Sequence, residues 1–381
     1  MPRLVCLAPL LLAASSVGHA SAPAIPSAAE APIAYLYDVS SGQVLFEREA
    51  DRRFMPASIV KAMTTYLAFE WLKSGRLDAR QRYLMDAKTF GEWGGRGSTM
   101  YLSANSLTSV DRLLAGITAV SANDGSAVLA KGAAQSVTGW TRSMNAKAAE
   151  LGMADSRFNT PNGWMDEGQT FTTARDLGRL GAALATRHPE LYARYIGRPE
   201  LTHNGIRQYN HDPITGRIEG ADGIKTGYTN QAGHGFLGSA ERDGRRLVMV
   251  VATSPRQSAR NHAARSLMEW GFAAFESRRL FEAGAIVAKA QVQGGASRTV
   301  GLTARDPVRL SVRRGTDPAI RVELQYDGPL IAPVEEGEEV ARLVTFLESE
   351  EVGQVPLFAS EAVGTAGPFA AIRNALASWL S

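Results

Sequence analysis

Ser58 and Lys61 are the polar side chains at the start of a mostly apolar stretch, residues 56–72. This pattern predicts a buried helix, in which residues three apart are neighbours on one face. Ser58 would lie in the first turn, where backbone N–H groups are free and the helix dipole is positive. Burial disfavours a charged lysine, so Lys61 can be neutral near pH 7 and accept a hydroxyl proton. The pair therefore predicts a serine nucleophile beside a lysine base.

The same spacing also fits a purely structural role. A serine at a helix N-terminus often caps free N–H groups, and a lysine often extends its amine to the surface. Two later polar groups favour the catalytic interpretation, one at a predicted corner between helices and one on a predicted strand. They are Ser121 with Asn123, and Lys225 with Thr226, Gly227 and Tyr228. Alone, the first group is more typical of a capped turn, because Ser, Asn, Asp and Gly are frequent turn residues.

The elements that must position these groups follow from the hydrophobic pattern. We expect a β-hairpin over residues 33–47, an irregular loop over 86–105 that forms a flexible wall of a cleft, and three strands between residues 222 and 253. Asp243-Gly244 joins the last two of these strands and is a strong hairpin signal. Helices are expected over residues 56–72, 112–120, about 126–135, 139–151, 173–186 and 258–275. Strands at both ends with helices between them predict one antiparallel sheet in an α+β domain.

The later part of the chain has a different hydrophobic pattern. Short alternating runs between residues 286 and 346, separated by Gly, Pro and Asp, predict a small all-β domain. Residues 368–380 place five apolar side chains on one face of a predicted amphipathic helix. That helix either packs on its own domain or lies in the plane of a membrane surface.

Composition narrows the classes of function. The chain has 381 residues, 45% hydrophobic and 21% charged, which is enough for two domains. A net charge of +3 without a basic run gives no support to nucleic-acid binding. Cys6, the only cysteine, lies in a segment that we expect to be removed, so the mature chain has no disulfide and no cysteine ligand for a metal. We expect neither a metal nor a cofactor.

Residues 1–22 have the charged, apolar and small-residue regions of a secretory signal peptide, with cleavage expected after Ala20 or Ala22. The apolar region is too short to span a bilayer permanently. Residues 22–31, rich in Ala, Pro and Ser, are expected to be a tether. An exported chain without cysteine suits the bacterial periplasm or cell surface.

Ser58-x-x-Lys61, Ser121-x-Asn123 and Lys225-Thr226-Gly227 together form the motif set of penicillin-binding proteins and β-lactamases. The surrounding sequence resembles one branch, the serine D-alanyl-D-alanine carboxypeptidases of the low-molecular-mass penicillin-binding proteins (peptidase family S11). The resemblance covers roughly residues 30–275. The segments that carry it besides the three motifs include residues 158–163, 172–176, 204–208 and 222–229.

The resemblance implies an acyl transfer in two halves. Ser58 would attack the carbonyl between the two terminal D-alanines of a peptidoglycan stem peptide, with Lys61 accepting its proton. Ser121 and Asn123 would relay a proton and position the substrate amide. Backbone N–H groups of Ser58 and Tyr228 would form the oxyanion hole. Water would then release the acyl group, whereas a β-lactam would acylate the same serine and leave slowly.

The resemblance also implies that the third motif captures the substrate: Lys225 and Thr226 would bind the terminal carboxylate. The chain departs from the family at two places. Ala122 occupies the middle of the Ser121 motif, which is tolerable because the flanking residues carry the chemistry. Asn210-His211 stands where relatives often supply an arginine for the carboxylate. His211 is therefore a candidate contact, and a surface histidine without that role is the alternative.

The implied architecture is a β-lactamase/transpeptidase-like domain followed by the all-β domain and the C-terminal helix. The expected segments are a signal peptide (1–22), a penicillin-binding catalytic domain (30–277), a β-sandwich-like domain (279–362) and a possible membrane anchor (367–381). The resemblance implies a periplasmic protein attached peripherally to the inner membrane, with stem peptides and β-lactams as ligands.

Two other functions compete with the carboxypeptidase. A β-lactamase needs a group that activates the deacylating water, and no Glu-x-x-Leu-Asn stretch follows Ser121. A non-catalytic wall-binding or scaffold protein would have no need of intact Ser58, Lys61 and Lys225.

Overall fold

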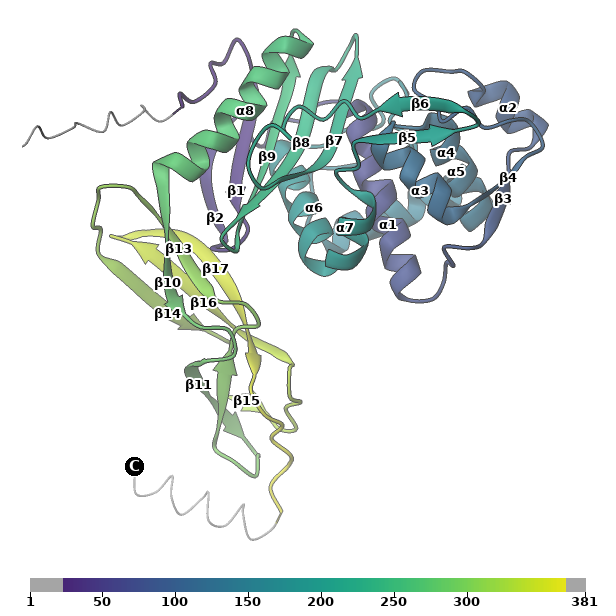
Figure 1. The fold of residues 1–381 in the computed structure, drawn as a ribbon. Coiled ribbons are helices and arrows are strands. Elements are labelled where there is room, and N and C mark those ends of the chain that lie inside the picture. The colour runs from purple at the N-terminus through teal and green to yellow at the C-terminus, as the bar shows by residue number, and fades with distance from the viewer. Residues whose placement is uncertain (1–22, 368–381) are drawn as a thin grey trace, which may run out of the picture.

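A five-stranded antiparallel sheet organises the larger domain in the computed structural model, which describes residues 23–367. The strand order is β2-β1-β9-β8-β7, so both ends of the domain's sequence supply neighbouring strands (Figure 1). The strands are β1 (Ile33–Asp38), β2 (Gln43–Arg48), β7 (Ala221–Thr229), β8 (Gly233–Arg242) and β9 (Arg245–Ser254). The predicted antiparallel sheet is confirmed.

The hairpin between β8 and β9 turns at Asp243-Gly244, as predicted. Both residues have positive φ, 51° and 69°, which is the conformation that a two-residue hairpin turn requires. Arg242 pairs with Arg245 directly across the turn. In the sheet, β8 lies between β9 and β7, and β7 is an edge strand.

Helices cover both faces of the sheet, with α8 on one face and α1 and α6 on the other (Figure 1). Separate apolar clusters fill the two sides, one around Met63 of α1 and Leu180 of α6, the other around Leu267 of α8. The helices are η1 (a 3-10 turn, Ala57–Ile59), α1 (Val60–Lys73), α2 (Ala87–Trp93), α3 (Val110–Ala119), α4 (Asn123–Ala134), α5 (Val137–Glu150), α6 (Ala174–Arg187), α7 (Pro189–Tyr195) and α8 (Gln257–Ala274). Two small two-stranded sheets complete the domain, β3 (Arg82–Leu84) with β4 (Leu107–Ser109) and β5 (Glu200–His203) with β6 (Ile206–Tyr209).

Two local expectations are wrong. The loop expected over residues 86–105 contains α2, because the Asp86 side chain accepts a hydrogen bond from the backbone N–H of Thr89 and caps a helix there. The second corrected element is α4, which begins at Asn123 and not near Ser126. Asn123 therefore lies in the first turn of a helix, while Ser121 stays on the corner before it.

The smaller domain is built from strands alone. Its main sheet has the order β14-β16-β17-β12-β11-β15, and β10 pairs separately with β13. The strands are β10 (Phe275–Phe281), β11 (Ile286–Gln293), β12 (Thr299–Thr303), β13 (Val308–Arg313), β14 (Ile320–Gln325), β15 (Leu330–Ile331), β16 (Glu339–Leu347) and β17 (Glu350–Ala359). The expected boundary between residues 277 and 279 falls inside β10, which belongs with β13 of this domain. The expected signal peptide, and all but the first residue of the expected C-terminal helix, lie outside the described residues.

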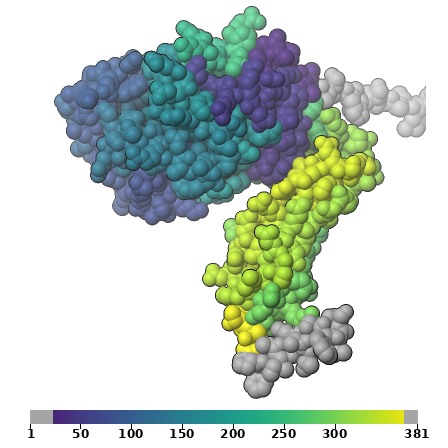
Figure 2. Space-filling model, turned by 180° about the vertical axis from the view of Figure 1, so that it is seen from behind, coloured from purple at the N-terminus to yellow at the C-terminus, as the bar shows by residue number. Residues whose placement is uncertain are grey.

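A buried polar cluster joins the two domains. Asp38 at the end of β1 accepts hydrogen bonds from Arg245 Nε (2.7 Å) and from Ser311 Oγ of β13 (2.5 Å). Gln43 Nε2 adds a bond of 3.0 Å to the Ser311 carbonyl oxygen. The smaller domain projects from this junction as an elongated lobe (Figure 2). Within residues 23–367, no helix has the length and hydropathy needed to cross a membrane.

Candidate active site

Ser58 and Lys61 meet at the junction of η1 and α1. The Lys61 Nζ atom lies 2.9 Å from Ser58 Oγ, and the Lys61 side chain is fully buried. The alternative in which the lysine extends to the surface is therefore wrong. Two carbonyl oxygens complete the surroundings of Nζ, Asn123 Oδ1 at 2.8 Å and the Asn162 backbone oxygen at 2.7 Å.

These partners fix the direction of the lysine lone pair. A carbonyl oxygen can only accept a hydrogen bond, so Asn123 and Asn162 each take one N–H of the amine. A neutral amine has two N–H groups and one lone pair, and the lone pair then points at Ser58 Oγ. In that state the Ser58 hydroxyl donates its hydrogen bond to Lys61, which is the geometry that deprotonation of a nucleophile requires.

The protonation state of Lys61 follows from its surroundings. Burial, and next the positive charge of Lys225, lower the pKa of Lys61 well below its usual value, while Asp124 opposes the shift. The Asp124 carboxylate is already engaged, because it accepts hydrogen bonds from the backbone N–H groups of Met100 and Leu102. Lys61 is thus suited to act as a base at neutral pH.

Ser121 and Asn123 approach the same point from the corner before α4. Ser121 has a left-handed backbone, with φ of 61°, and among the described residues its buried Oγ has no hydrogen-bond partner. Such strain and an unpaired polar atom are typical of functional positions. Asn123 bridges two parts of the site, because its Nδ2 donates to the Arg96 carbonyl oxygen at 3.0 Å while its Oδ1 accepts from Lys61.

Strand β7 forms the facing wall. A Cβ atom on Gly227 would lie 2.5 Å from the Pro56 carbonyl oxygen, so only glycine lets β7 approach η1 this closely. Next to it, Lys225 is buried and donates to the Thr226 carbonyl oxygen at 3.0 Å. Burial, with a smaller contribution from the charge of Arg260, lowers the pKa of Lys225 to about 7.

A cavity of about 240 Å³ opens between these elements. It brings together side chains from η1, the corner before α4, β7, β8 and α8, and includes His211. The lining residues are Ser58, Ser98, Ser121, His211, Thr226, Gly227, Tyr228, His234, Gln257 and Arg260. The Tyr228 ring is exposed and stacks on His234 with 4.1 Å between ring centroids. Burial, Lys225 and Arg260 together lower the pKa of His211.

Arg260 is the functional candidate that sequence reasoning missed. It lies on α8 with only 3% of its surface exposed, and among the described residues its Nε has no hydrogen-bond partner. Nη1 donates to the Gly235 carbonyl oxygen at 3.3 Å, and burial lowers the pKa of Arg260 to about 10. A buried, underpartnered guanidinium that lines a cavity is suited to bind a carboxylate. Arg260 is thus a candidate for the role of the arginine that is absent beside His211.

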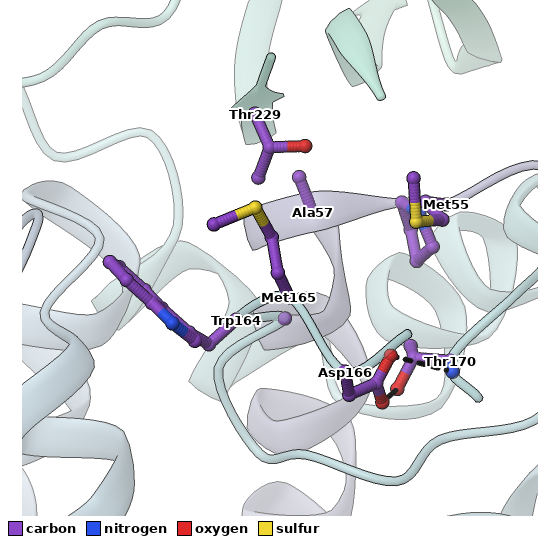
Figure 3. A pocket seen from close by; sticks show the side chains of 9 residues that line it. Met55, Ala57, Trp164, Met165, Asp166, Thr170 and Thr229 are labelled. Carbon is purple, nitrogen blue, oxygen red and sulfur yellow. Dashed lines mark hydrogen bonds between the residues drawn. The ribbon is translucent and has the colours of Figure 1, made fainter. Parts of the chain in front are cut away.

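A second, smaller pocket of about 10 Å³ is lined by residues of η1, the end of β7 and the loop at Trp164 (Figure 3). The side chains of Thr229, Met165 and Ala57 approach one another there, and the Trp164 indole stands at one side. Asp166 accepts hydrogen bonds from the Thr170 backbone and hydroxyl group, which fixes the loop that carries Trp164. In the part of the chain that the structure describes, no three His, Cys, Asp or Glu side chains group as a metal site.

Comparisons with known proteins agree with this geometry. The sequence model of the D-alanyl-D-alanine carboxypeptidase family matches residues 18–255. The model of the C-terminal domain of penicillin-binding protein 5 matches residues 275–365. A D-alanyl-D-alanine carboxypeptidase, DacA of Haemophilus influenzae, is 31% identical over 342 residues, which covers 88% of this chain and 85% of the relative. DacC of Escherichia coli is 32% identical over 339 residues, with 88% and 84% covered.

Solved structures of penicillin-binding proteins also match this chain. Penicillin-binding protein 5 from Haemophilus influenzae superimposes with a TM-score of 0.75 and 29% identity, and the match covers 89% of this chain and 99% of that one. Penicillin-binding protein D2 from Listeria monocytogenes, solved in an ampicillin-bound form, has a TM-score of 0.58 and 29% identity. That match covers 64% of this chain but 98% of the shorter protein.

Proposed function

Because this chain belongs to the D-alanyl-D-alanine carboxypeptidase family, we propose that it removes the terminal D-alanine from peptidoglycan stem pentapeptides through an acyl-enzyme on Ser58. The observation that carries the proposal is the fully buried amine of Lys61, 2.9 Å from the Ser58 hydroxyl group. As the serine oxygen attacks the carbonyl between the two D-alanines, the Lys61 lone pair takes its proton. Backbone N–H groups of Ser58 and Tyr228 would stabilise the resulting oxyanion.

Collapse of the tetrahedral intermediate requires a proton for the departing amine. Ser121 would relay that proton from Lys61; its Oγ lines the same cavity as Ser58 and has no hydrogen-bond partner among the described residues, which supports this role. Asn123 would hold the substrate amide through Nδ2. Water then enters, the base activates it, and hydrolysis frees Ser58.

The terminal carboxylate would bind in the part of the cavity that Thr226 and Arg260 line, near the Lys225 amine, which donates to the Thr226 carbonyl oxygen. A carboxylate that pairs with a desolvated guanidinium compensates the cost of burying that charge. His211 lines the same wall and is a secondary contact in this proposal.

The test is release of D-alanine from a pentapeptide that ends in D-Ala-D-Ala, together with mass spectrometry after incubation with penicillin. The intact protein should gain one penicillin adduct, and Ser58→Ala should gain none. Ser98→Ala is the matched control, because Ser98 lines the same cavity without contacting Lys61 and should leave the adduct in place. An adduct that survives on Ser58→Ala would refute the assignment.

We further propose a periplasmic location, with peripheral attachment to the inner membrane through residues 367–381. The apolar side chains spaced for one helical face in this sequence support it, although Arg373 alone gives little attraction to anionic lipid. The mature protein should sediment partly with lipid vesicles, and removal of these residues should release it. Equal sedimentation of both forms would rule out this anchor.

A further inference from the structure

An arginine without a carboxylate partner stands beside the catalytic asparagine. The Arg96 guanidinium carbon lies 4.7 Å from the ring centroid of Trp164 and 5.6 Å from that of Trp93. The two indoles meet edge to face, with their centroids 5.8 Å apart. Among the described residues Arg96 forms no ion pair, so the two indole rings are the side chains that hold its charge.

The loop that carries Arg96 is fixed to the reaction site. The Arg96 carbonyl oxygen accepts the 3.0 Å hydrogen bond from Asn123 Nδ2. The next residue, Gly97, has φ of +66°, and a Cβ atom there would lie 2.8 Å from both Asn123 Nδ2 and the Trp164 ring. The Arg96 backbone is therefore held directly against Asn123, the residue proposed to position the substrate amide.

The direction of the substrate along β7 brings its acyl part to this place. The terminal carboxylate binds near Thr226, so the preceding residues run along β7 toward Thr229, about 3.3 Å per residue. Thr229 shares the small pocket with Trp164 and Met165 (Figure 3). The residue that precedes the two D-alanines thus reaches the Trp164 indole, on which the Arg96 guanidinium lies.

We propose that Trp93, Arg96 and Trp164 form a subsite for the side chain of that preceding residue, and that the subsite selects a side chain ending in a carboxylate. A diamino dicarboxylic acid such as diaminopimelic acid carries this group, whereas lysine offers only the amine. A guanidinium stacked on aromatic rings keeps its N–H donors free for a carboxylate and loses little side-chain freedom when it binds. The inference rests on the proposed carboxypeptidase activity and specifies its substrate.

The experiment compares two acetylated pentapeptides that end in D-Ala-D-Ala and carry either diaminopimelic acid or lysine at the third position. The full-length mature protein should cleave the first with a kcat/KM roughly tenfold higher, as expected for one charge-assisted hydrogen-bonded pair. Arg96→Gln should abolish this preference, mainly by raising KM for the diaminopimelic acid peptide. Arg96→Lys, which keeps the charge but loses the planar stack, should restore part of it.

Arg80→Gln is the matched control, because the Arg80 side chain is 92% exposed and pairs with Asp78 away from the cavity. It should retain the preference. Equal cleavage of both peptides by the unmodified protein, or an equal loss for both in Arg96→Gln, would overturn the subsite while leaving the carboxypeptidase activity intact. Failure to release D-alanine from either peptide would overturn the proposed function itself, and the subsite with it.

Discussion

At the scale of single residues, the proposed mechanism depends on two buried lysines in opposite protonation states. Lys61 must be neutral to accept the Ser58 proton, whereas Lys225 must be charged to attract a carboxylate. Burial lowers the pKa of both lysines; the charge of Lys225 lowers the pKa of Lys61 further, and the charge of Arg260 lowers that of Lys225 further. The two requirements define a window of pH in which capture and proton transfer are both effective.

The upper edge of this window can be predicted for Lys225, whose pKa is lowered to about 7. Its charge is fully present below that pKa and is lost as the pH rises through it, so kcat/KM for a free-acid peptide should fall above about 7. Arg260 contributes to the shift, so Arg260→Gln should raise the pKa of Lys225 and move this fall to higher pH. The pH profile of kcat/KM checks this, and an amidated peptide should lack the fall. An unchanged profile in the variant would contradict the coupling.

The role of Lys225 itself can be separated from the proton network. Lys225→Ala should reduce kcat/KM for the free-acid peptide by about 2–4 kcal/mol of transition-state binding, because it removes a desolvated charge from its partner. The amidated peptide should lose much less. Steady-state kinetics with both peptides give the comparison. Equal losses would show that Lys225 serves proton transfer instead of the carboxylate.

At the scale of elements, the approach of the loop at Asn162 to η1 depends on a glycine. Gly163 has φ of +75°, and a Cβ atom there would lie 1.9 Å from the Ala57 carbonyl oxygen. Its neighbour Asn162 supplies the carbonyl oxygen that orients Lys61. The nucleophile, its base and this loop are thus held by backbone contacts that permit no side chain.

Gly163→Ala should lower stability by about 1–3 kcal/mol, from backbone strain together with the clash, and should slow acylation by penicillin. Gly168→Ala is the matched control, because Gly168 also has positive φ, +81°, but nothing lies within 4 Å of its Cβ position. Gly168→Ala should lower stability through backbone strain, with little change in the rate of acylation by penicillin. Thermal melts and adduct formation measure the two effects, and equal acylation rates would show that the contact with η1 is dispensable.

The elements differ in how far their roles could be predicted. Ser58 and Lys61 were predictable together because helical geometry fixes neighbours three residues apart. Asn162 acts through its backbone carbonyl oxygen, which every residue type has, so the sequence carries no signal for this role. Arg260 reaches the cavity only because α8 packs on β8 and β9, a tertiary arrangement that spacing along the chain does not reveal.

Several elements outside the site were also missed for physical reasons. Strand β17 contains Gly353 and Pro356, which are typical of turns. Its pairing with β16 overrides that preference. Helix α2 lies in a glycine-rich region and depends on the single cap at Asp86. The antiparallel sheet was predictable because the Asp243-Gly244 turn fixes its central hairpin.

At the scale of the whole molecule, we propose that the catalytic domain ends with α8 at Ala274 and the smaller domain begins with β10. A protein ending at Ala274 should be acylated by penicillin at a rate within a few fold of the full-length rate, because every residue proposed for catalysis precedes it. The Listeria protein, matched over 98% of its length by 64% of this chain, supports an independent catalytic unit.

The same truncation should lower the melting temperature, since Asp38 and Arg245 lose Ser311 and become exposed to water. Circular dichroism, thermal melts and adduct formation provide the measurements. A shortened protein that folds but does not react with penicillin would show that the smaller domain contributes to the site.

The large cavity and the small pocket have different consequences for drug resistance. In the proposed binding mode, penicillins and stem peptides both present a carboxylate to the part of the cavity that Arg260 lines, so a variant that rejects the drug there would also reject the natural substrate. The small pocket, at Trp164 and Met165, would meet the acyl side chain, in which drug and peptide differ. Selection by antibiotics should therefore accumulate substitutions around the small pocket and spare the carboxylate end.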